Sequence, residues 1–239
     1  MSHSNGKCEI RVHKLEMDTS ERTEHTKRVE KLAELVKSEY RAEDRSDRTV
    51  VFLADDFSIQ RTIDTLQPHA IRTSVFTRHV LDNDFVRQQE KDSLRYGRNL
   101  VALCGSDRRQ FERAALPDVK HYVFLEMPTS CVDTRRHLDR ARRSGQRVRV
   151  DVIYSRFDCP DNMREIKEAM EKCGQTPPEW IDELCRDPEE FRRKQDAEAE
   201  ELEKSRRVVI PARCIDIDWD DDDGWGEEEE CNEEDYVQW

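Results

Sequence analysis

The sequence predicts an α/β fold: one domain with a mostly parallel sheet and helices on both faces, followed by an acidic tail that is disordered by itself. Two observations predict this. Short, continuous apolar runs, typical of strands buried on both faces, alternate with one-sided apolar helices along most of the chain. In the last 25 residues this alternation gives way to acidic residues, which cannot form a core.

The first half of the chain begins with a loose apolar alternation at Glu9–Met17, which indicates an edge strand. From Ser20 to Tyr40, apolar residues recur at intervals of three and four, as on one face of a helix. The run VVFLA then predicts a buried strand. The expected elements here are strands at Val50–Ala54 and Ile71–Phe76, and helices at Asp56–Leu66 and Val80–Tyr96, the latter capped by Gly97.

The second half repeats the pattern. Apolar runs such as LVALC predict three more strands, and Pro128 ends the second of them. A Pro turn at Thr176–Leu184 holds Trp180, which we interpret as an anchor. The expected strands are Leu100–Cys104, Val119–Leu125 and Val148–Tyr154, and the expected helices are Arg108–Ala115, Val132–Arg143, Asn162–Cys173 and a solvated helix at Asp187–Arg206.

The charge is distributed unevenly. Residues 215–239 hold 13 Asp or Glu and no Lys or Arg, so the remaining residues, with 41 acids and 41 bases, are formally neutral. Residues 1–214 therefore lack the bulk basic excess of a non-specific nucleic-acid binder. This count does not exclude a local basic patch. We expect four segments: a disordered 1–8, a domain at 9–186, a charged helix and linker at 187–214, and the acidic tail at 215–239.

The eight cysteines have no CxxC spacing, and the seven histidines have no metal-ligand spacing, so no metal is expected. We interpret the cysteines as reduced thiols with a structural role. His79 and His137 are interpreted as surface or cap residues. No signal peptide and no apolar run of membrane-spanning length are present, so we expect a soluble intracellular protein with no membrane partner.

Four stretches carry a further signal: TVVFLADDFSIQRTIDTL at 49–66, RQQEKDSLRYG at 87–97, the strand and Arg-rich helix at 119–146, and EKCGQTPPEWIDELC at 171–185. In this order they resemble the second, C-terminal RecA-like lobe of DEAD-box RNA helicases, most closely the Vasa and Ded1 branch. The resemblance covers roughly residues 10–185. It implies a RecA-like domain that contacts RNA and the phosphates of ATP.

The departures from the family are equally informative. The family's arginine-finger motif reads HRIGRTGR, and the matching residues 139–146 read DRARRSGQ. Arg140 and Arg143 match the two family arginines that meet the γ-phosphate, but Asp139 replaces the histidine and repels a triphosphate. Arg87 matches the arginine of the family's QxxR motif, whose glutamine is Asp84 here. The family's motif V loop has no recognisable counterpart in Ser106–Pro117.

The first lobe is missing, since neither a GxxxxGK[ST] loop nor a DEAD box is present. The family's ATP chemistry needs both lobes. We therefore expect a pseudoenzyme with no catalytic residues and no cofactor, to which ATP binds only if another chain supplies the first lobe.

Two groups of candidate residues follow. Arg140 and Arg143 are the arginine-finger remnant and, with Arg87, candidate RNA contacts; the alternative is a solvated helix with Arg135–Asp139 and Asp139–Arg143 pairs. The tail tryptophans are candidate anchors for a partner; the alternative is a tail that only solubilises. The tail could also cover the chain's own arginines, in which case its deletion raises RNA affinity. The tail residues concerned are Trp219, Trp225 and Trp239.

The first functional hypothesis is a non-catalytic interaction protein that binds protein partners through the lobe and the tail. The resemblance places it in a cytoplasmic ribonucleoprotein setting, such as germ-line granules, with the nucleus left open. The alternatives are a weak RNA-binding protein that uses the retained arginines, and a half-helicase that completes the ATP site of another chain.

Overall fold

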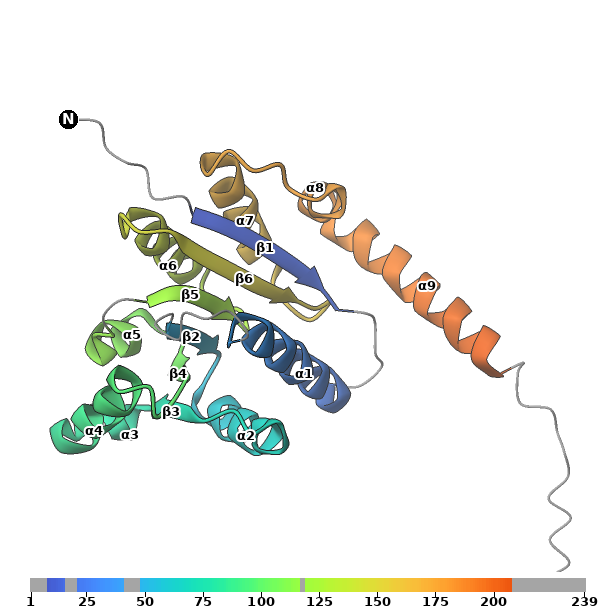
Figure 1. Ribbon diagram of the computed structural model, residues 1–239. Helices are drawn as coiled ribbons and strands as arrows, with labels where there is room; N and C mark the ends of the chain where they lie inside the picture. The colour runs from blue at the N-terminus through green and yellow to red at the C-terminus, as the bar shows by residue number, and fades with distance from the viewer. Residues whose placement is uncertain (1–7, 16–20, 41–47, 117–118, 208–239) are drawn as a thin grey trace, which may run out of the picture. The chain divides into compact units, whose positions relative to one another are not determined.

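The computed structural model describes residues 8–15, 21–40, 48–116 and 119–207. Its described strands form one parallel sheet in the order β1-β6-β5-β2-β4-β3 (Figure 1). The predicted α/β fold with a parallel sheet is therefore confirmed, and the expected edge strand is β1. The strands are β1 (Cys8–Lys14), β2 (Arg48–Leu53), β3 (Thr73–Phe76), β4 (Val101–Gly105), β5 (Val119–Phe124) and β6 (Val148–Tyr154).

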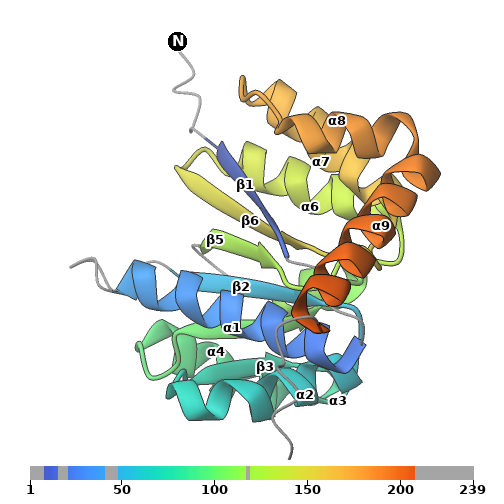
Figure 2. The same ribbon diagram turned by 90° about the vertical axis from the view of Figure 1, so that its right-hand side faces the viewer.

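Helices cover both faces of the sheet (Figures 1 and 2). α1 and α2 pack on one face, and α3 to α8 supply apolar side chains to the other. The helices are α1 (Glu21–Tyr40), α2 (Asp56–Leu66), the short 3₁₀ helix η1 (Gln67–His69), α3 (Arg78–Asp82), α4 (Asp84–Arg95), α5 (Arg108–Ala114), α6 (Cys131–Arg143), α7 (Pro160–Lys172), α8 (Glu179–Arg186) and α9 (Pro188–Arg207).

The covered faces of the sheet explain the apolar run Val50–Leu53 of β2. Successive side chains of a strand point to opposite faces. Val50 and Phe52 belong to the core under α3 to α8, whereas Val51 and Leu53 belong to the core under α1 and α2. Because both faces are covered, no position of the run is available for a polar residue.

The prediction of a single helix at Val80–Tyr96 is wrong in one respect, since the chain forms two helices there. Asn83 has an extended backbone (φ −109°, ψ 105°), and its side chain accepts hydrogen bonds from the amides of Phe85 and Val86. Asparagine is a favoured N-cap residue, so Asn83 ends α3 and begins α4. Gly97 (φ +67°) closes α4 as expected.

The compact part of the chain extends to Glu201. Trp180 of α8 stacks between Tyr154 (5.2 Å between ring centroids) and Phe191 of α9 (6.3 Å). The anchoring role predicted for Trp180 is thus confirmed, and the first turns of α9 are held by Phe191 and by the buried Gln195.

Candidate functional site

The carboxyl ends of the parallel strands lie at one edge of the sheet, where open α/β sheets usually bind their ligands. We call the carboxylates that follow these strands the carboxyl-edge acids. Among the residues that the structure describes, such acids follow β2, β4, β5 and β6. The carboxyl-edge acids are Asp55, Asp56, Asp107, Glu126 and Asp158.

Most of these acids bind backbone amides of the same edge. Asp55 accepts from the amide of Ser58 (2.7 Å) at the start of α2, and Asp107 accepts from Arg109 (2.8 Å) and Gln110 (3.2 Å). Glu126 accepts from the amide of Ala54 (2.9 Å), and Asp158 from that of Ser155 (2.8 Å). A phosphate would need such donors free. Here carboxylates already satisfy them.

Arg28 of α1 also lies at this edge and is buried. Its guanidinium donates to the carbonyl oxygens of Leu125 (2.6 Å) and Ile153 (3.0 Å), at the ends of β5 and β6. It also forms ion pairs with Glu24 and Asp158, each at 2.8 Å. Burial acts to lower the pKa of Arg28, but the charges of Asp158 and Glu24 outweigh it and raise that pKa. Arg28 is therefore neutralised by two carboxylates rather than presented to a ligand.

Glu126 and His25 form a second pair beside it, 3.4 Å apart. Burial works against the charge of Glu126, but hydrogen bonds from His25 and from the Ala54 amide lower its pKa. Glu126 is thus kept ionised, whereas burial raises the pKa of Asp158 in spite of the opposing charge of Arg28.

The Arg-rich segment at 139–146 occupies the last turns of α6 and the turn after it. Arg140 lies over the ring of Phe111, 4.7 Å from its centroid. Arg140 and Arg143 line an open hollow of ≈ 510 Å³ together with Glu112, Tyr122, Arg136, Asp139 and Ser144. The structure therefore brings the two predicted arginines to one hollow, which also holds two carboxylates.

The ion pairs on α6 differ in part from those expected. Asp139 pairs with Arg142 (3.1 Å) and Arg143 (3.5 Å), so the Asp139–Arg143 pair is confirmed. The expected Arg135–Asp139 pair is wrong. Arg135 instead forms two 2.6 Å hydrogen bonds with Glu165 of α7, because that carboxylate offers a bidentate partner across the helix interface.

Arg87, the third predicted arginine, does not line this hollow. Its guanidinium donates to the carbonyl oxygen of Leu81 (3.1 Å) at the end of α3 and pairs with Asp84. Arg113 of α5 donates to the same carbonyl (2.9 Å). In this structure Arg87 closes the last turn of α3 and holds the junction of α3 and α4.

The interpretation of His137 as a surface or cap residue is wrong. His137 is 3% exposed, and its ring lies 4.3 Å from that of Phe52 and 5.3 Å from that of Phe111. Its Nε2 donates to the carbonyl oxygen of Ser106 (2.8 Å). Burial lowers the pKa of His137. The residue joins α6 to the end of β4 inside the core.

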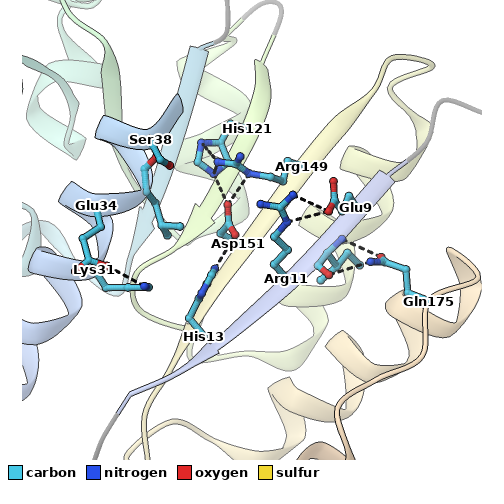
Figure 3. Close-up of polar contacts among 12 residues, drawn as sticks. Glu9, Arg11, His13, Lys31, Glu34, Ser38, His121, Arg149, Asp151 and Gln175 are labelled. Carbon is cyan, nitrogen blue, oxygen red and sulfur yellow. Dashed lines mark hydrogen bonds and ion pairs between the residues drawn. The ribbon is translucent and has the colours of Figure 1, made fainter. Parts of the chain in front are cut away.

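A polar cluster on the sheet was missed by sequence reasoning (Figure 3). Asp151 of β6 is fully buried and bonds to His13 of β1 and His121 of β5, each at 2.7 Å. Arg149 donates to the same carboxylate (2.7 Å), and Thr49 contacts His121 (3.0 Å). Burial favours the neutral acid, but the bonds from the two histidines and the charge of Arg149 lower the pKa of Asp151.

Across residues 8–15, 21–40, 48–116 and 119–207, no group of three or more His, Cys, Asp or Glu side chains could hold a metal ion; around Asp151, the two histidines bond to separate oxygens of the carboxylate. None of the helices in those ranges is both long and apolar enough to cross a membrane. The predicted tail anchors Trp219, Trp225 and Trp239 lie outside these ranges.

Comparisons with known proteins identify the fold. No protein-family model and no curated protein sequence matches the chain. Among solved structures, the RNA helicase Prp28 from Chaetomium thermophilum, bound to ADP, is similar over 76% of this chain and 40% of its own, with 16% identity and a TM-score of 0.54. The yeast DEAD-box splicing factor Prp28 is similar over 77% and 38%, with 12% identity and a TM-score of 0.58.

This chain therefore has the fold of a RecA-like lobe of a DEAD-box helicase. It spans about two fifths of the length of each Prp28 chain. At these identities the likeness shows the fold alone.

Proposed function

We propose that this chain is a non-catalytic, helicase-derived interaction module that binds protein partners in a ribonucleoprotein setting. It uses the RecA-like lobe for one contact and the acidic, tryptophan-bearing segment at 215–239 for another. The resemblance to the Vasa and Ded1 branch favours a germ-granule or similar cytoplasmic assembly. No cofactor is needed for this role.

The state of the carboxyl edge is the observation that carries the proposal. A lobe that handles ATP and RNA presents cations and free amides to phosphate oxygens. At this edge Asp55, Asp107 and Glu126 hold backbone amides, and Arg28 is buried among carboxylates. Such an edge repels phosphate and suits a protein surface.

The arginine-finger remnant supports the same conclusion. Asp139 pairs with Arg143, one of the two retained arginines, and Arg140 rests on Phe111. Both cations thus have partners within the lobe, and an Asp carboxylate stands beside them. A triphosphate would have to displace these contacts before it gained any.

A second candidate, weak RNA binding, is favoured by one observation. Three arginines, Arg136, Arg140 and Arg143, line the open hollow at the end of α6. They outnumber its two carboxylates, so a phosphate backbone could bind there with an affinity that falls steeply with salt. The role of Arg87 in that binding is weaker, because its guanidinium holds the end of α3.

ATP hydrolysis tests the proposal. The purified full-length chain is assayed for phosphate release with and without single-stranded RNA, with a two-lobed DEAD-box helicase as the positive control. We expect no hydrolysis above buffer. RNA-stimulated hydrolysis that is lost in the double variant Arg140→Ala/Arg143→Ala would overturn the proposal.

A further inference from the structure

A hollow with an apolar floor lies at the amino ends of β2, β4 and β5, at the edge of the sheet opposite the carboxyl-edge acids. Its volume is ≈ 150 Å³. Apolar cavities of roughly this size admit a benzene ring. The floor consists of five buried side chains, Val50, Leu94, Ala102, Leu116 and Val119.

The rim of this hollow is positively charged. Lys91 and Arg95 lie one turn apart on α4. Within the described ranges, neither Lys91 nor Arg95 pairs with a carboxylate, whereas Lys167 and Lys172 do. Burial, and then the charge of Arg87, lower the pKa of Lys91. The rim therefore attracts carboxylates.

We propose that this hollow is a docking site for a short acidic segment of a protein partner, which inserts one aromatic side chain over Leu94 and Val119 and places carboxylates on Lys91 and Arg95. This inference rests on the proposed function and names the surface that the lobe would use. Among the residues that the structure describes, Asp92 is the one acid that lines the hollow, and it already accepts a hydrogen bond from Gln88 (3.0 Å).

The floor distinguishes a protein side chain from an RNA base. A base buried there would lose hydrogen bonds to water along its polar edge, since the five floor side chains offer it no partner. Thr49 also lines the hollow, but its hydroxyl contacts His121. An aromatic hydrocarbon ring makes no such hydrogen bonds and therefore loses none on burial. The occupant that fits is therefore an aromatic side chain flanked by carboxylates.

Fluorescence anisotropy with the full-length chain tests the site. The ligand is a fluorescein-labelled peptide, Asp-Glu-Phe-Glu-Asp; one comparison peptide has Ala in place of Phe, and another has Lys in place of the acids. We expect saturable binding of the first peptide alone. The variant Lys91→Glu/Arg95→Glu should weaken it at least tenfold, and the matched control Arg78→Glu/Arg98→Glu should change it less than twofold. Circular dichroism confirms that each variant folds.

Four results would overturn the inference. The first is equal weakening in both double variants, and the second is equal binding of the Ala peptide. The third is a dimer in sedimentation that Lys91→Glu/Arg95→Glu dissociates, which would make a second copy the occupant. The fourth is that the peptide binds only after Trp219→Ala, Trp225→Ala and Trp239→Ala, which would make the chain's own tail the occupant.

The same preparations separate this inference from the proposed function. If no peptide binds and no ATP is hydrolysed, the docking site is wrong and the non-catalytic role stands. If ATP is hydrolysed, the proposed function is wrong, whatever the peptides do.

Discussion

Arg28, near the start of α1, and Asp158, just after β6, form a buried ion pair 2.8 Å long across 130 residues of sequence. The same guanidinium binds the ends of β5 and β6 through two carbonyl oxygens. The pair fastens α1 to the carboxyl edge of the sheet. It also neutralises a cation at the edge where open α/β sheets usually bind their ligands.

Replacement of Arg28 should be strongly destabilising. Arg28→Met leaves Asp158 and Glu24 buried without their partner, and breaking a buried pair in this way costs about 3–5 kcal/mol. Urea denaturation measures the loss. The exposed pair of Lys172 and Glu168 serves as the control, since Lys172→Met should cost less than about 1 kcal/mol. The double variant Arg28→Met/Asp158→Asn should recover part of the loss, and no recovery would contradict the pairing.

Asp151 should make the fold acid-sensitive. Its pKa lies below the ordinary value because bonds from His121 and His13 outweigh the effect of burial. A lowered carboxyl pKa contributes stability above the unfolded-state pKa of about 3.9, and that contribution is lost as pH falls toward the folded-state value. Below pH ~4, the wild-type chain should lose stability more steeply than Asp151→Asn. Chemical denaturation at pH 7, 5, 4 and 3 measures both slopes, and equal slopes would contradict the cluster.

His137 should contribute a second pH dependence, of the same direction but at higher pH. Burial lowers its pKa, so the unfolded chain takes up a proton at about pH 6.5 before the folded chain does. Stability tied to His137 is thus lost as pH falls below about 6.5. His137→Phe keeps a ring beside Phe52 and Phe111, and its stability should change less between pH 7 and 5. His79→Phe, at an exposed position, should behave like the wild type; identical profiles for all three would refute burial of His137.

The N-cap of α5 gives a prediction for the carboxyl-edge acids. Asp107→Ala removes the acceptor for the amides of Arg109 and Gln110 and should cost about 1 kcal/mol. Asp107→Asn should cost little, because asparagine caps about as well as aspartate. Thermal or urea unfolding of the two variants checks this. A similar loss for both would show that the charge, rather than the cap, is what matters there.

The elements were predictable because their signals are local. Val148–Tyr154 and Asp56–Leu66 were predicted with the bounds that the structure has, since each is a run with one clear periodicity. The break at Asn83 carried a signal, an asparagine one residue before an acidic helix start. His137 did as well, because Thr134, His137, Leu138 and Ala141 share one buried helix face.

The polar networks were not predictable. His13 and Asp151 are 138 residues apart, and they meet only because β1 adds to the sheet beside β6. In the sequence, Arg28 looks like any other charged residue of an amphipathic helix. Its role depends on the ends of β5 and β6, which it contacts only in the folded chain. The same holds for Arg135, whose partner Glu165 lies on the next helix. Pairs of this kind depend on strand order and helix packing, which no local pattern encodes.

RNA binding tests the central claim most directly. The full-length chain is titrated against fluorescent single-stranded RNA at low and moderate salt, with and without ATP, beside Arg140→Ala/Arg143→Ala. The account predicts no saturable binding at moderate salt, no effect of ATP, and no difference between the two proteins. Tight, salt-sensitive binding that ATP strengthens and the double variant loses would contradict it, and would mean that the lobe still handles RNA as a helicase lobe does.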